Sequence, residues 1–162
     1  MTTWSVVTVV MCAHIAVAVQ EGKIKEPQLH EHPTLVAMVK QNNYWRNQSG
    51  LSSHRISPHL MQLAQAHANW MASTGRFEHN YNHPYPEIIY WNAADIESAF
   101  AGWMNSGPHR AIMLSGNTHC GFGYAVAASG EQYWCGVYGS FQEEEAEPAV
   151  EQASAETPAE QN

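Results

Sequence analysis

Apolar side chains recur at helical spacing most clearly between Pro58 and Gly75. Leu60, Leu63 and Met71 fall on one face of this segment, with small alanines between them. Ser57 can cap its first turn, proline suits its first helical position, and Gly75 follows its last residue. The pattern therefore predicts a helix over 59–74 that packs closely on a neighbouring element.

Two further segments share this spacing. Residues 35–47 carry an approximate apolar stripe, with Thr34 as the expected cap and Gly50 just beyond the end. Residues 93–105 carry a second stripe, and Asn92 is the expected cap. Glycine and proline at 107 and 108 then break the pattern, and we expect only a short turn containing residues 111–114.

Shorter runs rich in β-branched and aromatic residues predict strands at 87–91, 119–128 and 132–140. The last two flank Ser129-Gly130 and are expected to form an antiparallel hairpin. The chain order of helix, helix, strand, helix, strand, strand is typical of an α+β fold.

The two ends of the chain differ from its middle. Residues 1–18 hold a short apolar stretch that ends in Ala16-Val17-Ala18, which predicts a cleaved signal peptide and hence an extracellular, periplasmic or cell-surface protein with no integral membrane span. An apolar terminal helix or a membrane anchor is the alternative. We interpret residues 19–33 as a linker, 34–141 as the domain and 142–162 as a disordered acidic tail.

The net charge of -8 arises mainly in that tail, which holds seven of the fifteen acidic residues. Residues 1–141 contain seven Lys and Arg against eight Asp and Glu, so they are nearly neutral. No basic face is expected on the domain, which excludes nucleic acid as a partner.

Cys120 and Cys135 would remain after signal cleavage, in a compartment that permits disulfides. A turn centred on Ser129-Gly130 places Cys135 opposite Tyr124, on the same face as Cys120 and about 13 Å away at strand rise. A disulfide needs Cα atoms roughly 4 to 7 Å apart, so pairing requires a different register. A disulfide and two buried free thiols both stay open.

His79, Glu87 and His109 lie at the ends of predicted elements, where scaffolds commonly present functional groups. Two imidazoles and a carboxylate suit a zinc site or an acid/base pair, although their spacing matches no local zinc signature. Hydrogen-bonded structural histidines are the alternative. His67 is predicted to be a core histidine, and His83 to be a solvated turn residue or an additional ligand.

Several short motifs, in order, resemble the CAP superfamily, which is the SCP domain of cysteine-rich secretory proteins, venom allergens and plant pathogenesis-related proteins. The resemblance spans residues 34–140 and has a compact, bacterial-type form. Its motifs are Asn43-Tyr-Trp-Arg46, Leu63-Ala-x-x-His-Ala68, Gly75-Arg-Phe-Glu-His79, Pro86-Glu-Ile-Ile89, Trp103-Met-Asn-Ser-Gly-Pro-His-Arg110, Cys120-Gly-Phe-Gly-Tyr124 and Tyr133-Trp134.

The resemblance implies an α-β-α sandwich with a small, mainly antiparallel sheet of about three strands between helices. It also implies secretion and a cavity with two histidines and two glutamates. His79, Glu87 and His109 match three of these four positions, and Ser106 stands at the fourth. Glycine and asparagine are missing beside Glu87, and Gly-Pro replaces Pro-Gly before His109.

Three functions remain open for such a protein. The first is a monomeric, non-enzymatic binding module whose cleft holds a small, lipid or glycan ligand, with no required cofactor and an optional zinc ion on His79 and His109. The second is a metal-dependent, peptidase-like hydrolase that uses Glu87 as its catalytic residue. The third is an extracellular structural module with a vestigial site. The loss of one acidic group at Ser106 favours the first.

Overall fold

The structure of the protein is a computed structural model that describes residues 29–141. The predicted signal peptide (1–18), most of the predicted linker (19–33) and the predicted tail (142–162) lie outside the described residues. The last part of the linker forms a short 3-10 helix, η1 (Leu29–Glu31). Between residues 29 and 141, no helix is both long enough and apolar enough to span a bilayer.

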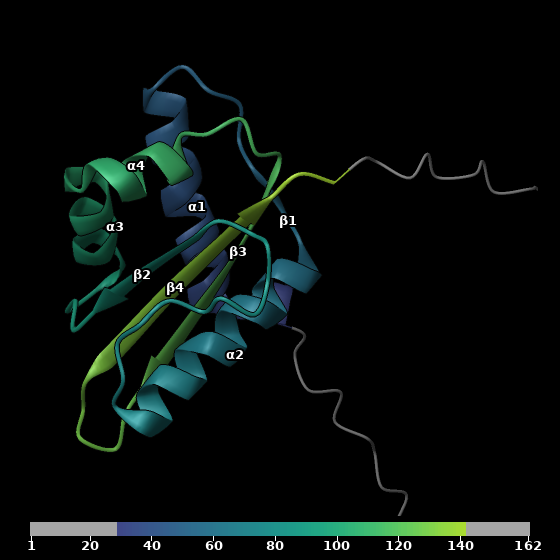
Figure 1. Cartoon of the computed structure of the whole chain (residues 1–162). Coiled ribbons are helices and arrows are strands. Elements are labelled where there is room, and N and C mark those ends of the chain that lie inside the picture. Colours follow the sequence, from purple (N-terminus) through teal and green to yellow (C-terminus); the bar gives the residue numbers. More distant parts are fainter. Residues whose placement is uncertain (1–28, 142–162) are drawn as a thin grey trace, which may run out of the picture.

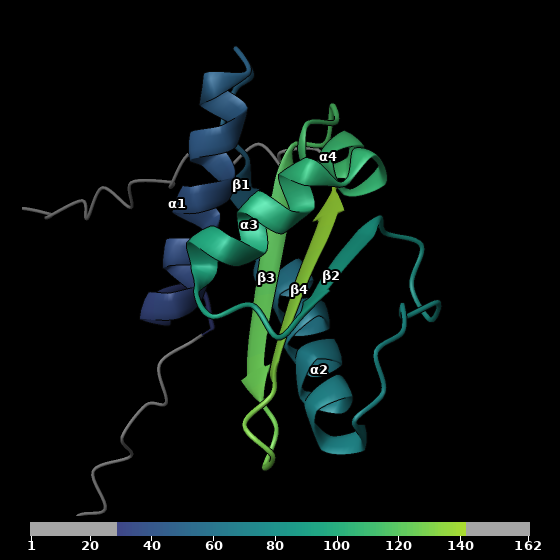
Figure 2. The ribbon, with the colours of Figure 1, turned by 90° about the vertical axis from the view of Figure 1, so that its left-hand side faces the viewer.

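The described chain is an α+β sandwich, as expected (Figures 1 and 2). Helix α2 covers one face of a central sheet, and α1, α3 and α4 cover the other. After η1, the elements are α1 (Pro33–Gln48), β1 (Arg55–Ile56), α2 (Pro58–Thr74), β2 (Glu87–Trp91), α3 (Ile96–Asn105), α4 (Gly107–Met113), β3 (His119–Val126) and β4 (Gln132–Gly139).

The sheet has four strands in the order β1-β3-β4-β2, where about three were expected. The hairpin of β3 and β4 forms its centre, and β2 pairs antiparallel with β4. The additional strand, β1, pairs in parallel with β3 through Arg55 and Ile56. Two residues are too few to produce an alternating pattern, which is why the sequence did not predict this strand.

Local capping chemistry explains where the helices begin. Ser57 accepts a hydrogen bond from the Leu60 amide at 3.3 Å at the start of α2, as predicted. For the other two helices the predicted caps were wrong. Helix α1 is preceded by His32 rather than Thr34, because proline occupies its first position; α3 begins after Asp95, which accepts from the Ser98 amide at 2.7 Å.

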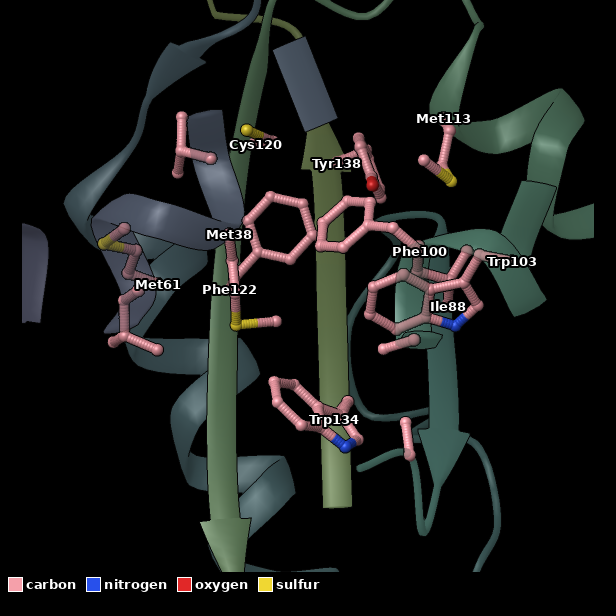
Figure 3. Packing of buried hydrophobic residues seen from close by; sticks show 14 residues of the cluster. Met38, Met61, Ile88, Phe100, Trp103, Met113, Cys120, Phe122, Trp134 and Tyr138 are labelled. Carbon is pink, nitrogen blue, oxygen red and sulfur yellow. The ribbon is translucent and has the colours of Figure 1, made fainter. Parts of the chain in front are cut away.

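Strand alternation sends side chains into two cores, one on each face of the sheet. The larger core lies under α1, α3 and α4 and gathers the big aromatic side chains, with Phe100, Trp103 and Phe122 fully buried (Figure 3). Trp103 Nε1 donates to the Ile89 carbonyl at 3.0 Å, which ties α3 to β2. The smaller core lies under α2 and includes Ala64, Ile89, Cys135 and Val137.

The predicted register of the hairpin was off by one residue. Cys135 faces Gly123 rather than Tyr124, because the five-residue connection 127–131 is centred on Ser129; Gly130 within it has a φ of 93°. A slip of one residue reverses the face of every side chain, so Cys120 and Cys135 lie in opposite cores. Both are buried free thiols.

Candidate functional site

Glu87 is the first residue of β2 and lies across from Val137 of β4. Strand alternation places it on the α2 side of the sheet, with Ile89 and Cys135, and its side chain is only 4% exposed. Cys135 Sγ lies 3.7 Å from Glu87 Oε2. A carboxylate in this position needs polar partners, because burial without them is costly.

The connection from α2 to β2 supplies those partners. His79 Nδ1 lies 2.9 Å from Glu87 Oε1, and the Asn80 backbone amide donates to the same oxygen, also at 2.9 Å. The His79 side chain is 38% exposed, so this bond fixes one ring nitrogen and leaves the other edge of the imidazole toward solvent.

Two more histidines complete the surroundings of Glu87. His67, predicted as a core residue, is buried on α2, bonds the Glu78 carbonyl at 2.8 Å through Nε2, and lies 3.8 Å from Glu87 Oε1. The prediction that His83 is solvated was wrong. Its side chain is 6% exposed and its Nε2 lies 3.5 Å from Glu87 Oε2, because the turn folds back over the start of β2.

Two cavities open beside this cluster, of about 410 and 360 Å³. His79, Asn80 and Tyr81 line both, so the imidazole stands between them. The larger is lined by Ala66, His67, Trp70, Glu78, His79, Asn80, Tyr81 and Asn82. The smaller is lined by His79, Asn80, Tyr81, His83, Pro84, Tyr85, Pro86 and Glu87.

The remaining two residues from the sequence prediction stand apart from these cavities. Ser106 precedes α4 as its cap residue and makes no side-chain capping bond. His109 lies in α4, which is a seven-residue helix where only a turn was expected. Burial, followed by the charge of His79, lowers the pKa of His109. His109 is thus within electrostatic reach of His79, but neither it nor Ser106 lines either cavity.

Few of the described side chains are placed to bind a metal ion together. Residues 29–141 contain no group of three or more His, Cys, Asp or Glu side chains placed to hold a metal ion. Structural zinc takes four protein ligands, and catalytic zinc takes three. His79 and His109 supply two imidazoles, and Glu87 already accepts hydrogen bonds from the Asn80 amide and the His79 ring.

Sequence reasoning missed the aromatic and amide side chains of the larger cavity. Trp70 stacks on His67 with ring centroids 5.5 Å apart and an interplanar angle of 12°. Tyr81 is 88% exposed at the mouth of the cavity, and Asn80 and Asn82 flank it. The sequence did contain a signal for Trp70. It follows His67 by three residues, so both side chains are expected on the same side of α2.

The protein is thus an α-β-α sandwich whose α2 side carries a cavity lined by polar and histidine side chains. Residues 39–138 match the Cysteine-rich secretory protein family (CAP), and the chain belongs to that family. No curated protein sequence matches the chain.

Several solved structures share the fold. An outer surface protein from Borrelia burgdorferi has a TM-score of 0.60 at 12% identity, covering 66% of this chain and 92% of that protein. Venom allergen-like protein 4 from Schistosoma mansoni has a TM-score of 0.53 at 11% identity, covering 68% and 90%.

An extracellular protein containing an SCP domain from Bacillus anthracis has a TM-score of 0.54 at 18% identity. The match covers 64% of this chain but only 40% of that protein. These identities are low, so the similarities establish the fold alone.

Proposed function

We propose that this protein is an extracellular binding domain, and that the larger of the two cavities beside Glu87 holds a small, glycan-like ligand. Family membership and the surface or extracellular location of two structural relatives support the location. The observation that carries the binding role is the cavity of about 410 Å³, in which Trp70 and Tyr81 lie beside Asn80, Asn82 and His79.

The chemistry of this lining selects the ligand class. Aromatic faces pack against flat apolar surfaces such as the face of a sugar ring. Amide and imidazole groups donate and accept hydrogen bonds at the ring's hydroxyl edge. A few polar groups placed among apolar ones are typical of small-molecule sites. A purely aliphatic chain would offer no hydrogen-bond partner to the side-chain amides of Asn80 and Asn82 or to the second ring nitrogen of His79.

The burial of Glu87, which lines the smaller cavity but not the larger one beside it, favours binding over hydrolysis in the larger one. A general base must reach the proton that it abstracts, directly or through one water. Glu87 Oε1 accepts from the Asn80 amide and lies against His79, and the side chain is almost fully buried. Glu87 therefore acts on the cleft through His79, as a positioning residue that fixes the orientation of the imidazole.

A titration of the full chain with chitotriose, followed by calorimetry and tryptophan fluorescence, tests the proposal. We expect saturable binding that is weakened ~5- to 10-fold in Tyr81→Ala, which removes one stacking surface. Tyr44→Ala is the matched control, because Tyr44 is also exposed but lies on α1, outside the cavity. Equal affinity in wild type and Tyr81→Ala, or binding of decanoate in place of chitotriose, would contradict the proposal.

A parallel titration with Zn²⁺ alone tests the zinc hypothesis for His79 and His109. Imidazole ligands account for the signal only if the binding heat is lost in both His79→Ala and His109→Ala. Heat that either variant retains would reject a shared zinc ion.

A further inference from the structure

The two cavities beside Glu87 follow one another along the connection between α2 and β2. This connection runs from the end of α2 along the edge of the sheet to the start of β2 (Figure 2). The larger cavity is lined by residues 66, 67 and 70 of α2 and by residues 78–82 of the connection. The smaller is lined by residues 79–81 and 83–87. The lining thus shifts from α2 to the start of β2 as the chain proceeds.

The boundary between the two cavities is formed by His79, Asn80 and Tyr81, which line both. Tyr81 is 88% exposed, and the His79 side chain is 38% exposed. Their ring centroids are 6.5 Å apart. A ligand that extends from one cavity into the other would therefore pass over an accessible phenol ring and an accessible imidazole.

The smaller cavity repeats the lining chemistry of the larger one. In the larger cavity, an aromatic side chain, Trp70, lies among amide and imidazole groups. In the smaller cavity, Tyr85, Pro84 and Pro86 supply the apolar surface, and His83 lies beside them. The two volumes, about 410 and 360 Å³, are also similar. Two neighbouring cavities of like size and chemistry match a ligand that is built from like units.

His83 adds a polar group to the smaller cavity that the fold itself does not use. Its side chain is 6% exposed, and neither ring nitrogen makes a hydrogen bond within the described part of the chain. Nε2 lies 3.5 Å from Glu87 Oε2, beyond the length of a normal hydrogen bond. Buried polar groups without a partner are rare in native proteins. A turn of this ring would present a nitrogen to a polar group in the cavity that it lines.

We propose that the two cavities are adjacent subsites of one groove, and that the ligand is a linear oligosaccharide with one sugar unit in each. This inference rests on the proposed glycan-binding function and adds the length of the ligand. Tyr85 is the stacking surface of the smaller subsite, as Trp70 and Tyr81 are of the larger. Because the second unit is linked to the first, its contact is intramolecular, and affinity rises with ligand length.

The test compares N-acetylglucosamine with chitobiose on the full chain by calorimetry. We expect chitobiose to bind at least ~10-fold more tightly. Tyr85→Leu keeps an apolar side chain against Phe141 but removes the aromatic face. It should abolish most of the gain from the second sugar, while the affinity for N-acetylglucosamine stays within ~2-fold of wild type. Tyr44→Leu is the matched control, because Tyr44 is exposed and lines neither cavity, and it should bind like wild type.

Amide NMR shifts of the wild-type chain give a second readout that needs no variant. We expect N-acetylglucosamine to shift residues 78–82, and chitobiose to shift His83 and Tyr85 as well. The two-subsite inference is overturned, and the proposed function kept, if both sugars bind equally tightly, if the shifts stop at residue 82, or if Tyr85→Leu keeps the full gain. If neither sugar nor chitotriose binds, the proposed function fails and this inference fails with it.

Discussion

Glu87 accepts two hydrogen bonds at Oε1, from the Asn80 amide and from the His79 ring, and a weaker one at Oε2 from the Cys135 thiol. His83 and Cys135 lie beside the other oxygen, at 3.5 and 3.7 Å. A glutamine at position 87 can still accept these hydrogen bonds through its amide oxygen, whereas an apolar side chain cannot. The side chain thus joins the connection after α2 to the start of β2.

The effect of replacing Glu87 on the free energy of unfolding should therefore depend on the shape and polarity of the new side chain. Glu87→Leu leaves the partly buried Asn80 amide without its partner, and we expect it to lower the free energy of unfolding by about 1 to 3 kcal/mol. Glu87→Gln keeps an acceptor at that oxygen and should cost clearly less. Urea unfolding of both variants measures the difference, and equal losses would contradict the assigned role of the hydrogen bond.

The contact between α2 and β3 depends on two glycines of the strand. A Cβ built on Gly121 would meet the backbone of Leu60 and Met61, and one built on Gly123 would meet the backbone of Ala64 and Gln65. Backbone atoms cannot move aside as a flexible side chain can. The absent side chains therefore set how close α2 comes to the sheet, and α2 carries His67 and Trp70.

Gly123→Ala should push α2 away from β3. We expect a loss of roughly 2 to 3 kcal/mol in the free energy of unfolding, since overpacking a rigid contact forces backbone shifts. Gly116→Ala is the control, because no atom lies within 4 Å of its added Cβ. Chemical denaturation compares the two variants. A Gly123→Ala variant as stable as Gly116→Ala would show that the contact between α2 and β3 accommodates the added methyl group at little cost.

Elements with local signals were predictable from the sequence, and elements that depend on distant partners were not. Helix α2 has its cap, proline and terminal glycine within its own segment, and its bounds were predicted closely. Strand β1 exists only because β3 lies beside it. His79 and Glu87 were grouped from their positions at the ends of predicted elements and from the resemblance, while the burial of His83 follows from a fold-back that no local pattern encodes.

At the scale of the molecule, polar chemistry is divided between two places. One is the histidine cluster around Glu87 on the α2 side. The other is a cavity of about 470 Å³, lined by Arg46 and Arg55 among others, where α1, β1 and the connection after α4 meet. Near Arg46, His54 belongs to a buried chain of hydrogen bonds. Tyr138 donates to Asn42 Oδ1 at 3.2 Å, which turns the Asn42 amide nitrogen toward His54 Nδ1 at 3.1 Å.

Because His54 Nδ1 accepts in this chain, the folded protein holds the ring neutral. Burial and the charge of Arg46 lower its pKa to about 4, against 6.5 for the ordinary side chain. The unfolded chain therefore binds a proton between these values that the folded chain does not, so stability falls as pH falls through this window. His109 and His119, whose pKa values are also lowered, act in the same direction.

The expected loss from His54 alone is about 2 kcal/mol in the free energy of unfolding between about pH 7.5 and about pH 5. Urea unfolding across this range measures it. His54→Gln removes the titrating ring, so the variant should be less stable at neutral pH but should lose less stability on acidification than wild type does. Equal pH dependence in the two proteins would mean that His54 is not held neutral in the fold, and that the acid response arises at other groups.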